Sequence, residues 1–301
     1  MAVLLLLKNR YLSIRDLRMD MKQNNIMAKL AALLVLFVFG VQANAQDLVI
    51  LHTNDTHSQI TPQVTGEGKG LGGYERREAY INSVVKKYGK KNVLLVDAGD
   101  FSQGSPYFSL FKGDVEIELL NALGYDVTCL GNHEFDNGQQ ELARRIGNAK
   151  FPMVCANYDF SGGPLEGVVK PYVVLKKGGK KIGIIGLLCN IKGVVSSKYL
   201  ENAKYLNPVK TVNKYALELK NQHKCDLIIA LSHCGHSAGR ETNPGDEYIA
   251  AKSENVDIIV GGHSHTKLKD KVVVKNKLGR DVIIVQDGEK GEYVGKLDVW
   301  F

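Results

Sequence analysis

The chain has 301 residues and a formal net charge of +7 at pH 7. Residues 1–45 hold six basic and two acidic side chains, a net of +4, so the remaining 256 residues carry only +3. A balance this close to neutral argues against a nucleic acid polymer as a partner, because such proteins are expected to carry clustered basic stripes. The remaining length is sufficient for a single domain with a substantial buried core.

Residues 1–45 have the layout of a secretory leader. The apolar run 30–41 follows Lys29 and precedes Ala43-Asn44-Ala45, which gives the charged, apolar and small-residue order of a signal peptide. Its twelve apolar residues are well short of the roughly 20 needed to cross a bilayer. We therefore expect cleavage before Gln46, export to the periplasm or the extracellular space, and no stable membrane span in the mature chain. Alternative starts are Met19, Met21 and Met27.

From residue 46 the sequence alternates short apolar runs with helical patterns. In chain order it predicts a strand at 48–51, a helix at 74–88, a strand at 93–96, a helix at 115–123, a strand at 127–130, a helix at 139–146 and a strand at 151–156. There follow a hairpin of 172–175 with 182–188, a helix at 208–222, a strand at 227–231, a helix at 246–252, a strand at 256–260, a strand pair at 271–274 and 282–285, and a closing segment at 293–301. Continuous apolar runs are typical of strands that are covered on both faces. We therefore predict an α/β fold, a layered α/β/α sandwich of mixed sheets flanked by helices over residues 46–301.

The five cysteines all lie after the leader, at Cys129, Cys155, Cys189, Cys225 and Cys234. An odd number cannot pair completely, and a chain of this size does not need disulfides to be stable. We predict buried free thiols, which pack as small hydrophobic side chains.

Metal-ligand side chains follow five of the predicted strands. An Asp-x-His or a Gly-Asp at a strand end is by itself most often an ordinary turn. His263-x-His265 is a stronger signal, because alternate residues of an extended segment lie on one side. Ligands gather at the carboxyl ends of the strands in such sheets, so the joint occurrence predicts one shared site. Its candidate metal ligands are Asp55, His57, Asp100, Asn132, His233, His263 and His265.

This set is large enough to hold two metals if Asp100 bridges them. Its mixture of imidazole, carboxylate and amide groups suits Mn, Zn, Co or Fe better than Ca or Mg. The residue types do not choose among these four metals.

The motifs together resemble those of the calcineurin-like metallophosphoesterase superfamily and, within it, of the periplasmic 5′-nucleotidase family. The resemblance spans residues 47–301 and rests on the segments 51–57, 72–74, 131–136, 231–233, 261–265, 285–288 and 295–297. It implies one metal held by Asp55, His57, Asp100 and His265, and a second held by Asp100, Asn132, His233 and His263. It also implies that His133 and Asp136 form the catalytic pair.

The resemblance implies a metal-dependent phosphohydrolase that cleaves nucleotide phosphate esters with a hydroxide activated by two divalent metals. His133 would stabilise developing charge or protonate the leaving oxygen, and Asp136 would orient His133. The open alternatives are a broader phosphomonoesterase, a 2′,3′-cyclic phosphodiesterase, a nucleotide-sugar hydrolase, and a non-enzymatic subunit of a split, two-chain nucleotidase.

Members of the resembled family usually carry a second, C-terminal domain that recognises the nucleoside, whereas this chain stops at Phe301. The expectations are therefore a separate partner chain that carries such a domain, a catalytic domain that acts alone on a broader range of phosphate esters, or a truncated gene.

Other polar residues near the motifs are weaker candidates. We predict that His52 is structural, that His223 is solvated, and that Glu134 supports the site from behind the ligands. His236 is near enough to His233 in sequence to contact a substrate. The glycine-rich run 66–73 lacks the Gly-Lys-Ser/Thr signature of a phosphate-binding loop, so we interpret it as the entry to a helix.

Overall fold

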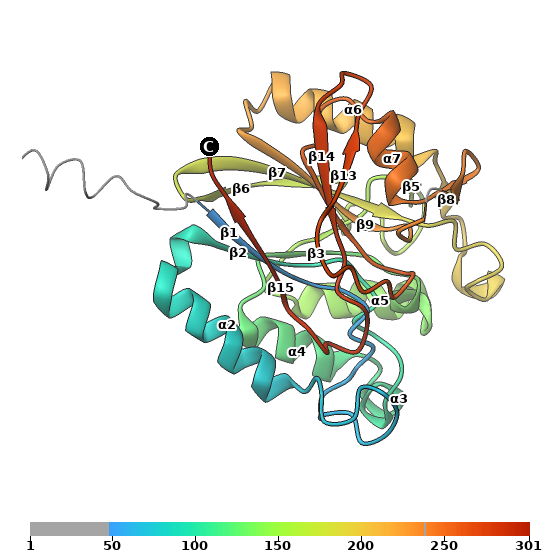
Figure 1. Cartoon of the computed structure of the whole chain (residues 1–301). Coiled ribbons are helices and arrows are strands. Elements are labelled where there is room, and N and C mark those ends of the chain that lie inside the picture. Colours follow the sequence, from blue (N-terminus) through green and yellow to red (C-terminus); the bar gives the residue numbers. More distant parts are fainter. Residues whose placement is uncertain (1–47, 238) are drawn as a thin grey trace, which may run out of the picture. The chain divides into compact units, whose positions relative to one another are not determined.

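Two β-sheets pack face to face in the computed structural model, which describes residues 48–237 and 239–301 (Figure 1). The first sheet has the strand order β15-β1-β2-β3-β4, and the second has the order β13-β14-β12-β9-β7-β6. The leader predicted for residues 1–45 lies outside the described residues. No helix in the described part of the chain has the length and apolarity that a bilayer crossing requires.

In the first sheet four parallel strands are bordered by one antiparallel edge strand. These strands are β1 (Leu48–Thr53), β2 (Val93–Asp97), β3 (Val127–Cys129), β4 (Met153–Val154) and the edge strand β15 (Gly295–Val299). Its helices are α2 (Tyr74–Tyr88), α3 (Pro106–Phe111), α4 (Asp114–Leu123) and α5 (Gly138–Asn148).

In the second sheet β7, β9, β12 and β14 are parallel, with antiparallel strands at both edges. The strands are β6 (Tyr172–Lys177), β7 (Lys180–Leu188), β9 (Leu227–His233), β12 (Ile258–Gly261), β13 (Val272–Lys275) and β14 (Asp281–Val285). The short pairs are β5 (Tyr158–Asp159) with β8 (Lys204–Tyr205) and β10 (Gly239–Arg240) with β11 (Asn243–Pro244). Helices α6 (Pro208–Asn221) and α7 (Asp246–Lys252) follow β8 and β11.

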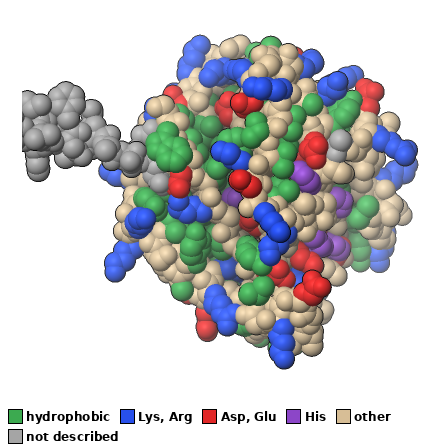
Figure 2. Space-filling view, in the orientation of Figure 1, with side chains coloured by type: hydrophobic (Ala, Val, Ile, Leu, Met, Phe, Trp, Pro, Cys, Tyr) green, Lys and Arg blue, Asp and Glu red, His purple; other side chains and the backbone are tan. Residues whose placement is uncertain are grey.

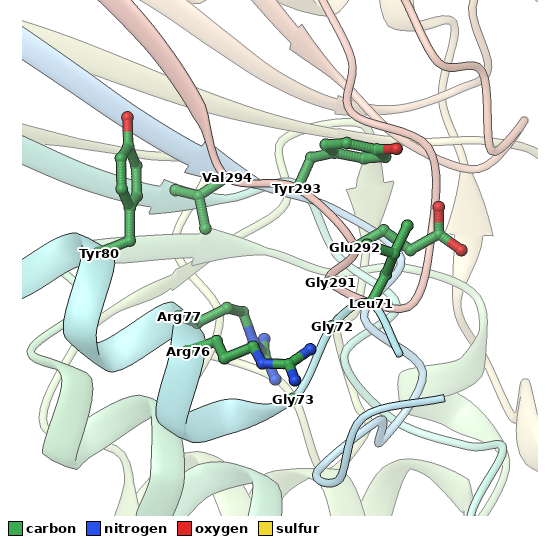
Figure 3. Close-up of a pocket in the computed structure, with 10 residues that line it drawn as sticks. All are labelled: Leu71, Gly72, Gly73, Arg76, Arg77, Tyr80, Gly291, Glu292, Tyr293 and Val294. Atoms are coloured by element: carbon green, nitrogen blue, oxygen red, sulfur yellow. The ribbon is translucent and has the colours of Figure 1, made fainter. Parts of the chain in front are cut away.

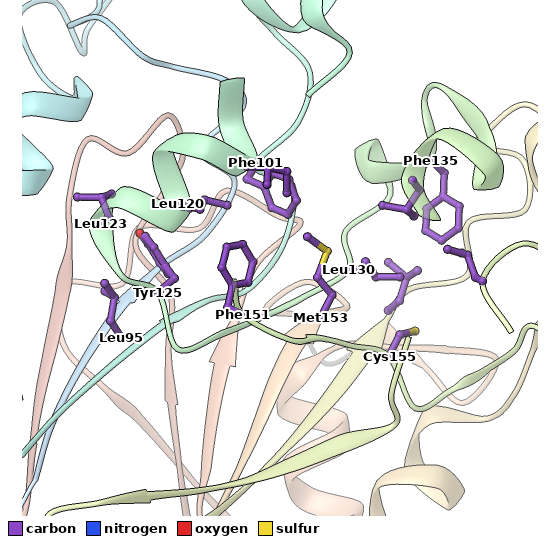
Figure 4. Packing of buried hydrophobic residues seen from close by; sticks show 14 of the residues in the cluster. Leu95, Phe101, Leu120, Leu123, Tyr125, Leu130, Phe135, Phe151, Met153 and Cys155 are labelled. Carbon is purple, nitrogen blue, oxygen red and sulfur yellow. The ribbon is translucent and has the colours of Figure 1, made fainter. Parts of the chain in front are cut away.

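Three apolar clusters fill the spaces between these layers. One lies between the two sheets, where Leu48 and Ile50 of β1 meet Ile229 of β9. The alternate residues Val49 and Leu51 point the other way, into a cluster shared with α2, α4 and α5. Part of that cluster, beside α4 and the 3₁₀ turn at Phe135, is drawn in Figure 4.

The third cluster lies between the second sheet and the helices α6 and α7. Each central strand therefore buries both faces, which is why the apolar runs in the sequence are continuous rather than alternating. The predicted layered α/β architecture is confirmed, and its β layer is double.

The contact between the two sheets depends on a glycine in β7. A Cβ atom at Gly186 would lie well inside van der Waals distance of the carbonyl group of Val154 in β4. We expect Gly186→Ala to lower the free energy of unfolding by about 1–3 kcal/mol, because an added methyl group has no room between the sheets. Urea unfolding midpoints measure the effect.

Gly147 in α5 is the matched control for this substitution. A Cβ there would meet no atom within 4 Å, so Gly147→Ala should raise the free energy of unfolding by about 0.5–1 kcal/mol through helix propensity. Equal midpoints for the two variants would show that the sheets are not packed closely at Gly186.

Candidate metal centre

The loops that follow β1, β2, β3, β9 and β12 meet at one edge of the two sheets. The His57 backbone N–H donates to the Asp100 carbonyl at 3.0 Å, and the His133 N–H donates to Asp100 Oδ1 at 2.8 Å. The His263 N–H donates to Asp55 Oδ2 at 2.9 Å. Figure 2 shows histidine side chains gathered on one face of the molecule, close to acidic groups. The predicted convergence of the strand ends is therefore present in the structure.

The seven predicted ligands divide into two groups around Asp100. Asp55, His57 and His265 each offer one ligand atom, and these atoms lie within 4.8 Å of one another. The same holds for Asp100, His233 and His263. His57 also groups with Asp100 and His133, so the Asp100 carboxylate lies beside both sets.

The remaining predicted ligand, Asn132, joins the second group through its amide oxygen. Asn132 Oδ1 lies 2.9 Å from His263 Nδ1. Five of the seven side chains are buried, His263 is half-buried, and the side chain of His265 is 38% exposed. A mostly buried set with one open side can hold ions and still admit a substrate.

Left-handed backbone conformations direct these side chains toward the common centre. Asp55, His57 and Asp100 have φ values of 47°, 45° and 54°. His263 and His265 have φ values of 74° and 53°. Non-glycine residues seldom adopt positive φ, and such strained positions cluster at functional sites. The concentration of five here indicates that the loops are shaped for function rather than for local stability.

The hydrogen bonds of His233 test whether the centre fits a metal. Its Nδ1 lies 2.7 Å from the Ala98 carbonyl oxygen, which can only accept, so Nδ1 carries the proton. Nε2 then faces Asp100 Oδ2 at 3.0 Å and Asp55 Oδ1 at 3.8 Å, and it makes no hydrogen bond. In the neutral imidazole this places a nitrogen lone pair against carboxylate oxygens, an arrangement that requires a positive charge between them.

The pKa shifts at the centre also indicate that a positive charge is needed between His233 and the carboxylates. Burial by itself would lower the pKa of His233, but the carboxylates of Asp100 and Asp55 raise it to about 10. Burial by itself would raise the pKa of Asp100, yet His233 holds it well below its usual range. Either a proton or a metal cation can compensate the negative charge of the two carboxylates. Together with the mixed imidazole, carboxylate and amide donors, it fits divalent metal ions.

His133 and Asp136 form a pair beside the two groups. His133 Nδ1 lies 2.8 Å from Asp136 Oδ2, and each side chain is 31% exposed. The hydrogen bond to Asp136 raises the pKa of His133, against the effect of burial. The ring of His133 lies edge-on to that of His57, with 5.4 Å between the ring centroids. An imidazolium held at this place can reach a group bound at the centre.

Glu134 supports the centre from behind. Its carboxylate accepts hydrogen bonds from the backbone N–H groups of Gly131, Asp100 and Ser102, at 2.6, 2.9 and 3.1 Å. Gly131 has to be glycine, because a Cβ atom there would overlap Asp100. Glu134 is fully buried, so this anchor fixes the loop that carries Asp100.

The segment 288–293 is a second support for the centre, and its residues 289–293 lie outside the motifs that predict the site. The Lys290 N–H donates to the Asp55 carbonyl at 2.6 Å, and Glu289 Oε2 lies 3.2 Å from His265 Nδ1. The Asn54 side chain donates to both Asp55 Oδ2 and the Gly288 carbonyl at 2.7 Å. These contacts fix one face of Asp55 and one ring nitrogen of His265.

The weaker candidates lie in structural contacts. His52 is buried and its Nδ1 lies 3.0 Å from Asp287 Oδ2. His223 Nε2 lies 3.0 Å from the Tyr172 hydroxyl, so it is hydrogen-bonded rather than simply solvated. His236 Nε2 lies 3.3 Å from Glu247 Oε1. All five cysteines are buried and free, as predicted.

Two hollows lie near the segment 288–293. One, of about 270 Å³, lies at the start of α2, where Figure 3 shows Arg76 and Arg77 below Tyr293 and Val294; its lining includes no predicted metal ligand. The other, of about 680 Å³, is lined by His265 together with Lys267 and the loop 63–68. This second hollow adjoins the candidate metal centre through His265.

Comparisons with known proteins show which family the chain resembles. The family model described as calcineurin-like phosphoesterase matches residues 48–267. The chain is 35% identical over 286 residues to the snake venom 5′-nucleotidase of Gloydius brevicauda, covering 87% of this chain and 46% of that protein. It is 33% identical to the 5′-nucleotidase of Homo sapiens, covering 86% of this chain and 47% of that protein.

Among solved structures, a 5′-nucleotidase precursor from Thermus thermophilus matches with a TM-score of 0.74 and 35% identity, covering 83% of this chain and 50% of that chain. An NAD nucleotidase from Haemophilus influenzae matches with a TM-score of 0.72 and 33% identity, covering 83% and 46%. The chain thus spans about half the length of the relatives it matches. Both the fold and the family match cover the predicted centre, and the chain belongs to the calcineurin-like phosphoesterase family.

Proposed function

We propose that this chain hydrolyses nucleotide phosphate esters at a centre for two divalent metals. The observation that carries the proposal is the Asp100 carboxylate, which lies beside two groups of ligand atoms and is 3.0 Å from Nε2 of His233. Calcineurin-like phosphoesterases use dinuclear divalent metals. Relatives named 5′-nucleotidase support nucleotides as the substrate class.

The two ions would share Asp100. Asp55, His57 and His265 would complete one position, in line with their mutual distances. Asn132, His233 and His263 would complete the other, supported by the contacts of His263 with Asn132 and of Asp100 with His233. Bound divalent metals supply Lewis acidity, which lowers the pKa of water and neutralises charge on phosphoryl oxygens. Mn, Zn, Co and Fe suit this donor set.

His133 would act on the leaving group. Its Nδ1 is engaged by Asp136 at 2.8 Å, so a proton on Nε2 is free to stabilise or protonate the departing oxygen. Asp136 favours the charged imidazolium and holds the ring in one orientation. The hollow of about 680 Å³ beside His265 gives room for the part of the substrate beyond the phosphate.

We also propose that the protein is exported. This proposal draws support from the signal-like order of Lys29, the apolar run 30–41 and Ala43-Asn44-Ala45.

A substrate panel tests the activity. The purified full chain would be assayed with Mn²⁺, Co²⁺ or Zn²⁺, and with a chelator as control, on 5′-AMP, 5′-UMP, 2′,3′-cyclic AMP, a nucleotide sugar and p-nitrophenyl phosphate. We expect metal-dependent release of phosphate that is fastest from the 5′-monophosphates. Preference for p-nitrophenyl phosphate would favour a broad phosphomonoesterase, and inactivity with every metal would favour a non-enzymatic subunit.

A further inference from the structure

We infer that Arg145 is a positioning residue for the metal centre. Its hydrogen bonds hold the loop that carries Asp100 and the loop that carries Asn132 in a fixed relative position. The inference rests on the proposed metal site, because it assigns Arg145 a role in how tightly that site holds its ions. Arg145 belongs to α5 and has no place in the motifs that pointed to the site.

Arg145 is completely buried, at 0% exposure, and is one of the largest fully buried side chains among the described residues. An arginine is seldom buried to this extent unless its charge is paired. Its Nη1 donates to Ser102 Oγ at 2.9 Å, and its Nη2 donates to the Glu134 carbonyl oxygen at 2.5 Å. The guanidinium group therefore directs these hydrogen bonds to two loops rather than to its own helix.

Both acceptors lie two residues beyond a proposed ligand. Ser102 follows Asp100, and Glu134 follows Asn132. The Glu134 carboxylate in turn accepts from the backbone N–H groups of Asp100 and Ser102. Arg145 thus closes a ring of hydrogen bonds across the two loops, and neither loop can shift without breaking a buried hydrogen bond.

Nearby carboxylates, of which Glu134 and Glu116 are buried and Glu141 is half-buried, supply the compensating charge. Burial lowers the pKa of Arg145, and the carboxylates of Glu134, Glu141 and Glu116 oppose that effect. Glu116 is itself buried and accepts a hydrogen bond from Ser58, the residue after His57. The same charge cluster therefore extends to the loop of a third proposed ligand.

The neighbouring backbone leaves room for this arginine. A Cβ atom at Gly113, at the start of α4, would overlap the Arg145 guanidinium group. Space, nearby carboxylate charge and acceptors for both terminal nitrogens are provided for this side chain behind the centre, while its Nε makes no hydrogen bond. A side chain that only filled the core would need neither the acceptors nor the charge.

Arg144 offers a matched control on the same helix. It is exposed and pairs with Asp114 of α4 and Glu141 of α5, each at 2.6 Å. Both of these partners lie on helices rather than on the loops of the centre. Arg144→Met and Arg145→Met remove the same charge and the same shape from adjacent positions, so their difference isolates the link to the loops.

The experiment measures the affinity of the full chain for Mn²⁺ by isothermal titration calorimetry, together with the rise in Tm on adding Mn²⁺. We expect Arg145→Met to weaken Mn²⁺ binding by about 10-fold or more, as loss of supporting groups around a metal site typically does. Arg144→Met should stay within about twofold of the wild type, since exposed ion pairs contribute little. Arg145→Lys, which keeps the charge, should recover part of the affinity.

Wild-type Mn²⁺ affinity in Arg145→Met, even with a lower Tm in the metal-free protein, would overturn the inference and leave Arg145 a core residue. If Arg145→Met does not fold, Ser102→Ala removes only the Oγ acceptor and should weaken Mn²⁺ binding by about two- to tenfold, the range for one hydrogen bond; an unchanged affinity there would also overturn the inference. Failure of the proposed function is distinguishable, because it would appear in the wild type as Mn²⁺ binding without hydrolysis of any nucleotide.

Discussion

Asp100→Asn is expected to abolish turnover of nucleotide substrates, with a loss of roughly 10³-fold or more, and to weaken metal binding at both positions. Asparagine has nearly the same shape as aspartate but lacks its negative charge. The Asp100 carboxylate lies 3.0 Å from His233 Nε2 and groups with ligand atoms on both sides. Bound metals contribute several kcal/mol by stabilising charge in the transition state. Each 1.36 kcal/mol of lost stabilisation lowers the rate tenfold.

The measurements are kcat with the preferred substrate and the bound metal per chain by atomic absorption. Asp97→Asn is the control, because Asp97 is a buried carboxyl group at the end of β2 whose oxygens accept hydrogen bonds from Thr53, Thr128 and the Gly99 N–H. Asp97→Asn should retain both metals. Two tightly bound metals in Asp100→Asn would contradict the proposal that both metals share the Asp100 carboxylate.

His133→Asn is expected to lower kcat by about 10²–10⁴-fold while the chain keeps its metals. That range is typical for the loss of a general acid. The His133 backbone N–H, which donates to Asp100 Oδ1 at 2.8 Å, stays in place in the variant. The ligand groups around Asp100 should therefore keep their geometry. The kinetic constants and the metal content are measured on the same preparation.

Asp136→Asn is the companion variant for His133, because Asp136 contacts the imidazole at Nδ1. It should reduce kcat by less than His133→Asn does, since the ring remains but loses its orienting partner. Equal loss of metal in Asp100→Asn and His133→Asn would refute the division into metal-binding and proton-donating roles.

The fold was predictable where local pattern and tertiary packing agree. The helices Tyr74–Tyr88 and Asp246–Lys252 have the predicted bounds, because Gly73 and Gly245 precede them and an apolar face continues through each. The prediction was too long at 151–156, where only Met153 and Val154 pair with β3. Helix α3 was missed because it has six residues, of which only Phe108 is buried.

The candidate site was predictable because its chemistry lies at strand ends. Alternating strands and helices bring those ends to one edge, and the unusual residue types there stand out against ordinary turns. Supporting residues carry no such signal. Arg144-Arg145 looks like the solvated face of a helix, and only tertiary packing decides that Arg145 points inward. The contact of Lys290 with Asp55 is a backbone hydrogen bond, which almost any residue could make.

The most direct test is anomalous X-ray diffraction from crystals of the full chain grown with Mn²⁺. Two anomalous peaks on either side of the Asp100 carboxylate, one within reach of His57 and His265 and the other within reach of His233 and His263, are the predicted result. A single ion, or ions bound away from Asp100, would contradict the account.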